Sequence, residues 1–273
     1  MTKPTEDDLA RIEAAAADLA RLAGAEAQAA FGRVVRVAYK DEDPVAAGFK
    51  DPVSEVDQDV ERLVRARLAE DFPEHDVIGE EMDERPGRGH DFVWAIDPID
   101  GTTNFVNAFP MFSSTIGVLH RGEPVAGAVW CSTSHALRPG VYSAHRGGRL
   151  RFDGEPYAPP KNPGVKRRLI GAPDALFGRE GLPGDLRKTG SAAIECAFVA
   201  AGLLSAARFQ PLNLWDVAGG VCLAQAAGIE VRADTGQGMA PFERFEPMAR
   251  GGAAPDLRFW RGGLILGPPG GLA

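Results

Sequence analysis

Cysteine is scarce in this sequence, and its spacing excludes the usual cysteine-based frameworks. Cys131, Cys196 and Cys222 are the only three cysteines among 273 residues, and no two of them form a C-x-x-C pair. An odd number of cysteines cannot make a fully paired disulfide framework. The sequence therefore favours a reducing compartment.

The sequence also lacks an excess of basic residues and a long apolar run. With 30 Lys and Arg against 38 Asp and Glu, the formal net charge is −8, which disfavours binding to the phosphate backbone of a nucleic acid. The longest nearly apolar stretch, residues 192–207, contains Glu195 and Ser205 and is shorter than the roughly 20 residues that span a bilayer. We expect it to form a buried helix, and we expect neither a nucleic acid nor a membrane as a partner.

The first residues, MTKPTEDDLARIE, do not resemble a secretory signal. They have neither its basic start nor its apolar run. Together with the scarcity of cysteine, this predicts a cytoplasmic protein.

Two capping boxes predict helices in the first quarter of the chain. Thr5 and Asp8 form one box, and Ser54 and Asp57 form the other. Between the two helices, a short β-like run at 34–39 leads into a loop with Pro and Gly at 41–52. The apolar positions expected to face the core are Leu9, Ile12, Ala16, Leu19 and Ala23 in the first helix, and Val56, Val60, Leu63, Val64 and Leu68 in the second.

The pattern then becomes strand-like, and later mixed. Apolar runs at 77–78 and 92–96 end near carboxylates, and the runs at 114–119 and 127–130 predict an antiparallel meander with its turn at 121–124. A strand at 168–171 and helices at 192–207 and 215–227 follow. Because residues 153–164 are rich in Pro and Gly, we divide the chain into units 1–152 and 153–273. The fold class expected is α/β.

Several carboxylates are grouped without a neighbouring His or Cys. Glu80, Asp97 and Asp100 lie close in sequence, and Asp216 follows Trp215 at a helix start. Oxygen ligands of this kind suit Mg²⁺, Mn²⁺ or Ca²⁺ and not structural zinc. Because the proline at 98 cannot continue a strand ladder, we expect the chain to turn there and to aim both aspartates at one point. The alternative is that these aspartates are ordinary turn and cap residues.

A short stretch of small, hydrogen-bonding residues follows these aspartates directly. Gly101, Thr102 and Thr103 suit a helix N-terminus whose free N–H groups would hold an anionic phosphate, with Gly101 permitting close approach. A cation site and a phosphate site are therefore contiguous in the sequence.

Three segments together resemble the signature of the inositol monophosphatase family of metal-dependent phosphatases. They are IGEE at 78–81, WAIDPIDGTTNFVNAFP at 94–110 and WDVAGG at 215–220. The resemblance runs from about Thr5 to about Gly267. It implies an αβαβα sandwich with two intimately packed halves, a homodimer and inhibition by lithium.

The resemblance also implies a set of metal ligands. Two or three Mg²⁺ ions per subunit are implied, with Mn²⁺ as a substitute. One ion would be held by Glu80, Asp97 and the backbone carbonyl of Ile99. A second would be held by Asp97, Asp100 and Asp216, and Glu80 would help to hold the third.

Catalytic roles follow from the same resemblance. It implies that Thr102, hydrogen-bonded to Asp57, orients the attacking water, and that Glu80 belongs to the same catalytic group. The backbone at Gly101, Thr102 and Thr103 would bind the phosphate. The alternative for Asp57 is a purely structural role as the third residue of its capping box, and both roles are compatible.

The residues expected to contact the alcohol are less clearly marked. By resemblance they are Gly190, Ser191 and Ala192, although Ser191 is equally suited to be a helix cap. Family members that hydrolyse inositol phosphates usually carry an Arg, an Asp and a Glu where this chain has Leu203, Ser205 and Phe209. The substitution of Phe209 for a carboxylate that binds ring hydroxyls puts inositol specificity in doubt, because Phe209 offers an apolar face.

Basic residues near this region are open to two interpretations. Arg187, Lys188 and Arg208 would favour a second anionic group on the substrate, or they are solvated surface charges.

The function expected is Mg²⁺-dependent hydrolysis of a small phosphomonoester by an activated water. Inositol 1-phosphate is the first substrate implied, and a sugar phosphate, histidinol phosphate or a 3′-phosphonucleotide is the alternative. A different class also stays open: a metal-binding regulatory protein that acts through contacts with another macromolecule.

Overall fold

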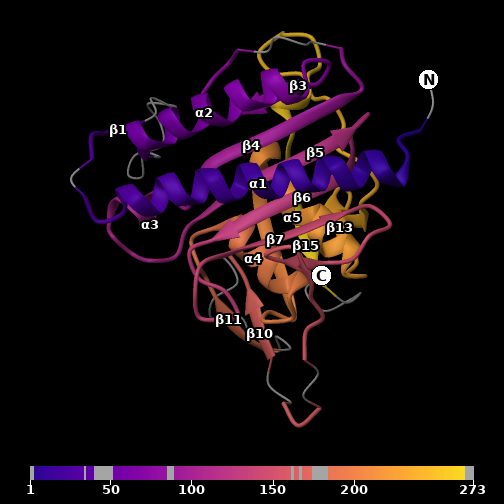
Figure 1. The fold of residues 1–273 in the computed structure, drawn as a ribbon. Coiled ribbons are helices and arrows are strands. Elements are labelled where there is room, and N and C mark those ends of the chain that lie inside the picture. Colours follow the sequence, from indigo (N-terminus) through magenta and orange to yellow (C-terminus); the bar gives the residue numbers. More distant parts are fainter. Residues whose placement is uncertain are drawn as a thin grey trace.

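The computed structural model describes residues 3–33, 35–39, 52–84, 89–160, 163–165, 168–173 and 184–267. The segment 41–51, which holds almost all of the loop predicted from Pro and Gly, lies outside the described residues. The observed architecture is a stack of alternating helical and sheet layers (Figure 1).

The first layer consists of two helices that begin at the predicted capping boxes. In α1 (Glu6–Ala30), the N–H of Asp8 donates to Thr5 Oγ1 at 3.2 Å and the N–H of Thr5 donates to Asp8 Oδ2 at 3.0 Å. The box of Ser54 opens α2 (Glu55–Asp71) in the same way. The predicted core positions are confirmed except for Val56, which is half-buried, and Leu63, which is 39% exposed. Leu63 is exposed because it lies on the outer side of α2, beside the buried row that includes Val64.

The second layer is a seven-stranded sheet, one face of which packs against α1 and α2 (Figure 1). Its strands are β3 (Asp76–Gly79), β4 (Phe92–Asp100), β5 (Ser113–His120), β6 (Glu123–Cys131), β7 (Gly140–His145), β8 (Arg151–Phe152) and β9 (Glu155–Pro156). They lie in chain order, β3 is parallel to β4, and every later pair is antiparallel. The predicted meander is thus confirmed. Its turn is the pair Arg121 and Gly122, both with positive φ, which matches the twist of a two-residue hairpin.

Strand β4 corrects one expectation about Pro98. The strand does not end at Asp97 but continues through Pro98 to Asp100, and the pairing with β5 shifts register between Asp97 and Asp100. The missing N–H of Pro98 therefore interrupts the ladder locally without ending the strand.

Helices α4 (Ala192–Ala200) and α5 (Leu214–Ala226) form the third layer, against the other face of this sheet. The contact with α5 is close because glycines face it. A Cβ on Gly117 would lie 2.5 Å from Ala218 Cβ, and a Cβ on Gly127 would lie 2.5 Å from the carbonyl oxygen of Gly219. Asp216 is therefore brought close to the sheet.

The helix expected over 192–207 is shorter than predicted. It ends at Ala200, and Gly202 takes a left-handed φ of 73° that favours glycine. The apolar residues that follow, Ala206 and Ala207, belong to a buried strand. A continuous apolar run does not by itself distinguish a buried helix from a buried strand.

The fourth layer is a six-stranded sheet formed by the rest of the chain. Its strands are β10 (Arg168–Gly171), β11 (Gly184–Arg187), β12 (Ala206–Asn213), β13 (Val231–Asp234), β14 (Met239–Pro241) and β15 (Arg261–Leu266), in the order β11-β10-β12-β15-β13-β14. A 3₁₀ turn, η2 (Leu257–Phe259), precedes β15. The smaller elements are β1 (Val37–Tyr39), paired with β2 (Pro52–Ser54), and α3 (Thr102–Val106).

The α/β layered fold class is confirmed, and the described residues supply the first four of the five layers expected. The seven-stranded sheet extends to Pro156, just beyond the proposed division between residues 152 and 153. That division stays a proposal. No helix among the described residues combines the length and the apolar character needed to cross a membrane.

Candidate functional site

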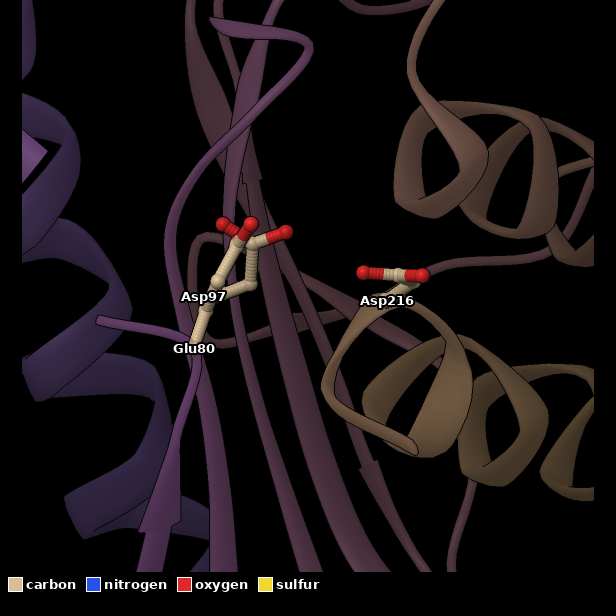
Figure 2. A group of neighbouring side chains, drawn as sticks. All are labelled: Glu80, Asp97 and Asp216. Atoms are coloured by element: carbon tan, nitrogen blue, oxygen red, sulfur yellow. The ribbon is translucent and has the colours of Figure 1, made fainter. Parts of the chain in front are cut away.

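Three carboxylates from distant parts of the chain converge at one point. Glu80 directly follows β3, Asp97 lies in β4, and Asp216 lies in the first turn of α5 (Figure 2). One oxygen from each lies within 4.8 Å of the others. Since Gly79 pairs with Ile96 across the parallel strands β3 and β4, the residues that follow them, Glu80 and Asp97, are neighbours by register.

The buried position of Asp97 makes this cluster electrostatically strained. Asp97 is 2% exposed, and its Oδ1 has no hydrogen-bond partner among the described residues. Burial raises the pKa of Asp97 well above its usual value, and the nearby charges of Glu80, Asp100 and Asp216 raise it further. A cation placed among these oxygens would reduce the repulsion between the carboxylates and would provide a partner for the unpaired oxygen of Asp97. The donor chemistry therefore fits a hard divalent cation.

Asp216 has two roles in the structure. It is the third residue of a capping box at the start of α5, in which the N–H of Asn213 donates to Asp216 Oδ2 at 2.8 Å. The same carboxylate belongs to the acidic cluster. The cap holds the side chain in one orientation, so the structural role supports the proposed ligand role.

Asp100 lies beside this cluster but is not one of its three members. Its carboxylate accepts hydrogen bonds from the start of α4, from the N–H groups of Ala192 (3.2 Å) and Ala193 (2.7 Å), and from the hydroxyls of Ser113 (3.1 Å) and Ser191 (2.5 Å). Burial raises the pKa of Asp100 to about 6, although these hydrogen bonds act in the opposite direction. The cap interpretation therefore describes the observed contacts of Asp100, and its role as a metal ligand stays a prediction.

Thr102 lies within hydrogen-bond distance of Asp57, as the resemblance implies, and closer still to the carbonyl oxygen of Ile99, a contact that the resemblance does not imply. Thr102 Oγ1 lies 2.8 Å from the carbonyl oxygen of Ile99 and 3.3 Å from Asp57 Oδ1. A threonine hydroxyl has one hydrogen, so it donates to one of these acceptors at a time. Asp57 is itself fixed, because the N–H and hydroxyl of Ser54 donate to its Oδ2 at 2.9 and 2.5 Å.

The segment after Asp100 begins helix α3 at the edge of the site. Gly101 has a φ of 91°, and a Cβ there would lie 3.0 Å from the carbonyl oxygen of Gly190. Asn104 crosses between the two sequence units, because its Nδ2 donates to the carbonyls of Met111 (2.6 Å) and Thr189 (2.8 Å). No local pattern of residues indicates this bridging role of Asn104.

Most of the predicted residues line one pocket of about 430 Å³, and Asp57 is not among its described lining residues. The acidic cluster lines this pocket, and Lys188, Arg208 and Arg261 line it as well. Arg187 is exposed and is not among the described lining residues. The predicted members that line the pocket are Glu80, Asp97, Ile99, Asp100, Gly101, Thr102, Thr103, Gly190, Ser191, Ala192, Phe209 and Asp216.

The three residues that differ from the family pattern lie in different surroundings; they are Leu203, Ser205 and Phe209. Phe209 lines the pocket but is only 8% exposed, because it packs in the core between α5 and the six-stranded sheet. Its apolar face is therefore largely buried. Ser205 donates to the carbonyl of Leu169 at 3.0 Å, and among the described lining residues neither Ser205 nor Leu203 occurs.

Glu195 is a further buried acid in the wall of the same pocket. Its Oε1 accepts from the N–H of Thr189 at 2.9 Å and from the Thr189 hydroxyl at 3.0 Å. Burial raises the pKa of Glu195 to about 7. The side chain therefore ties the segment between β11 and α4 to the helix itself.

Comparison with known proteins identifies the family of this chain. The family model described as the inositol monophosphatase family matches residues 8–265. A protein from Aquifex aeolicus named fructose-1,6-bisphosphatase/inositol-1-monophosphatase is 32% identical over 225 residues, which cover 78% of this chain and 82% of the relative. The Escherichia coli K12 protein named Nus factor SuhB is 33% identical over 216 residues, which cover 72% and 78%.

The fold agrees with solved structures as well. The structure of the Thermotoga maritima IMPase has a TM-score of 0.71 and 26% identity, over 94% of this chain and 91% of that one. Because the family model spans nearly the whole chain and the relatives share the same layered fold, the chain belongs to the inositol monophosphatase family, whose members are phosphomonoester hydrolases.

Proposed function

We propose that this protein hydrolyses a small phosphomonoester with Mg²⁺, and that inositol 1-phosphate is the first substrate to test. The observation that carries the proposal is that Glu80, Asp97 and Asp216 converge, and that the buried Oδ1 of Asp97 has no hydrogen-bond partner among the described residues. An acidic cluster with a buried, unpartnered oxygen suits a cation better than it suits a purely structural contact.

The proposed ligands divide between two principal ions. Glu80, Asp97 and the Ile99 carbonyl would hold one Mg²⁺, and Asp97, Asp100 and Asp216 would hold a second, with Glu80 contributing to a third and Mn²⁺ as a substitute. Divalent cations at such a site lower the pKa of water and neutralise the charge on the phosphoryl group and the leaving oxygen.

The chain's own residues would position the reactants. The hydroxyl of Thr102, supported by Asp57, would orient the attacking water, since Ser54 keeps the Asp57 carboxylate in place. The N–H groups at Gly101, Thr102 and Thr103 would donate to the phosphate oxygens. Ser191 would contact the alcohol with Gly190 and Ala192, although its hydroxyl is already engaged by Asp100.

The basic side chains of the pocket support an alternative substrate. Lys188, Arg208 and Arg261 line the pocket that holds the acidic cluster, which suits a phosphomonoester with a further anionic group. The name of the Aquifex aeolicus relative includes fructose-1,6-bisphosphatase. A sugar bisphosphate is therefore the first competitor of inositol 1-phosphate, and histidinol phosphate and 3′-phosphonucleotides complete the set.

A phosphate-release assay with a panel of these phosphomonoesters tests the proposal. We expect turnover that requires Mg²⁺, and the ratio of kcat/KM between inositol 1-phosphate and fructose 1,6-bisphosphate distinguishes the two substrate classes. Absence of turnover over the whole panel, with Mg²⁺ and with Mn²⁺, would contradict the proposed activity.

A second candidate function is a regulatory role through contacts with a macromolecule. It is supported by the relative named Nus factor SuhB. A panel without turnover would favour this candidate. Three further expectations are measurable with the same preparation: a homodimer by light scattering, inhibition by Li⁺, and recovery in the cytoplasmic fraction of the cells that make the protein.

A further inference from the structure

Arg258 donates hydrogen bonds to the backbone of the segment that carries Glu80. It lies on the 3₁₀ turn η2, where its own N–H donates to the capping Asp256 at 2.8 Å, and its side chain is 18% exposed. The Nη1 atom donates to the carbonyl oxygens of Gly79 at 2.7 Å and of Met82 at 3.0 Å. These two carbonyls lie on either side of Glu80.

The same segment is also held by residues of helix α2. Glu61 is fully buried, and its Oε2 accepts from the N–H of Glu81 at 2.7 Å. A Cβ on Gly79 would lie 2.0 Å from Glu61 Oε1, so Gly79 permits this close approach. Arg65 completes the support, since its Nε donates to Glu61 Oε1 at 2.7 Å and its Nη2 donates to the Met82 carbonyl at 3.0 Å.

Arg258 also contacts the helix that carries Asp216. Its guanidinium lies 5.5 Å from the ring centroid of Trp215, the residue that directly precedes Asp216. One side chain therefore touches the backbone on both sides of Glu80 and the neighbour of Asp216. The two carboxylates come from different layers, so their separation depends on contacts of this kind.

We infer that Arg258 is a positioning residue that sets the distance between Glu80 and Asp216, and hence the affinity of the acidic cluster for a divalent cation. This inference rests on the proposed function, because it assumes that the cluster binds a cation. The guanidinium suits the role since it can donate to two carbonyls and stack on an indole at once, whereas a lysine ammonium offers a point charge without a planar face.

Asp83, the exposed ion-pair partner of Arg258, allows the effect of the ion pair to be measured apart from that of the carbonyl and Trp215 contacts. Asp83 lies 2.6 Å from the guanidinium and its side chain is 87% exposed. Such an exposed ion pair contributes little. If Arg258 acts through the two carbonyls and Trp215, removal of the Asp83 carboxylate leaves the cation affinity unchanged.

The test is calorimetric titration of Mn²⁺ into the full chain after treatment with EDTA, with Arg258→Ala and Arg258→Lys compared with the unaltered chain. Loss of a residue that orients metal ligands typically weakens metal binding 10–100-fold, so we expect both variants to bind Mn²⁺ at least about tenfold more weakly. Asp83→Ala should stay within about twofold of the unaltered chain.

Arg232 provides the matched control for a merely structural role. It is a partly buried arginine in β13 of the six-stranded sheet, and its Nη2 donates to the carbonyl of Met239 at 2.6 Å. We expect Arg232→Ala to lower the melting temperature without changing the Mn²⁺ affinity by more than about twofold. The rise in melting temperature on addition of Mn²⁺ is a second readout, and it should be smaller in both Arg258 variants than in Arg232→Ala.

The outcomes separate the inference from the proposed function. If the unaltered chain binds Mn²⁺ and Asp97→Asn does not, the cluster is a cation site; Arg258→Lys with unaltered affinity would then overturn the inference alone. If the unaltered chain does not bind Mn²⁺, both the proposed function and the positioning role of Arg258 are contradicted. Should Arg258→Ala not fold, Arg258→Lys carries the test.

Discussion

Asp100, at the end of β4, accepts a hydrogen bond from the main-chain N–H of Ala193 in α4, with an N···O distance of 2.7 Å. A carboxylate from the first sheet thus caps a helix that begins 92 residues later at Ala192. The contact fixes α4 relative to the end of β4. It also means that an aspartate in the signature motif has a structural role as well as its proposed role as a ligand.

Substitution Asp100→Ala should therefore destabilise the fold even without metal. The variant leaves the N–H groups of Ala192 and Ala193 at a buried helix start without their acceptor, which costs about 1–3 kcal/mol. Urea denaturation in EDTA measures this loss. Asp8→Ala at the exposed capping box of α1 is the matched control, and we expect a smaller loss there because water can replace the lost acceptor. An Asp100→Ala protein as stable as the unaltered one would contradict the capping role.

Asp97→Asn should have the opposite effect on the metal-free fold. Burial and the neighbouring charges of Glu80, Asp100 and Asp216 raise the pKa of Asp97, so an ionised carboxylate there opposes folding and a neutral amide does not. We expect the variant to lose turnover and, in EDTA at pH 8, to melt at or above the temperature of the unaltered protein. A variant that melts clearly lower, or that keeps its turnover, would argue against this assignment.

The hydroxyl of Thr102 offers a kinetic test. If it orients water, Thr102→Ala should lower kcat by about 100-fold or more with little change in KM, whereas Thr102→Ser keeps the hydroxyl and should lose about tenfold or less. Steady-state kinetics with saturating Mg²⁺ measures the difference. Equal kcat values for the alanine and serine variants would show that the hydroxyl has no such role.

The raised pKa of Glu195 predicts that the stability of the fold depends on pH. Because burial raises its pKa from 4.5 to about 7, the folded chain binds this proton more tightly than the unfolded chain does. The contribution of Glu195 is therefore present below pH 4.5 and is lost as the pH rises through 7. Glu195→Gln keeps an acceptor for Thr189 and should remove this loss.

The measurement is urea denaturation of both proteins in EDTA from pH 5 to pH 8. The stability of the unaltered protein relative to the variant should fall over this range by on the order of 2–3 kcal/mol. A constant difference between the two proteins would contradict the raised pKa.

Local chemistry made much of the fold predictable from the sequence. The capping boxes at Thr5 and Ser54 fix helix starts through contacts three residues apart, and the alternation of strands and turns fixes the meander. The convergence of Glu80 and Asp97 was also accessible, because each follows a short apolar run in the sequence. In each case the deciding contact lies within a few residues or within one strand pair.

The remaining features depend on contacts that no local pattern encodes. The cap on α4 is supplied by Asp100 from another layer, and the backbone around Glu80 is held by Arg258, almost 180 residues away in sequence. The end of α4 at Ala200 depends on the left-handed Gly202 inside an apolar run. The sequence predicts that Phe209 offers an apolar face to the substrate, whereas tertiary packing leaves the residue only 8% exposed.

The most direct test of the central claim is an anomalous difference map from a crystal soaked with Mn²⁺. We predict a peak within about 2.0–2.3 Å of carboxylate oxygens from Glu80, Asp97 and Asp216, and its loss in Asp97→Asn crystals soaked in the same way. A map without a peak among these three side chains, from crystals of a protein that turns over with Mn²⁺ in solution, would contradict it.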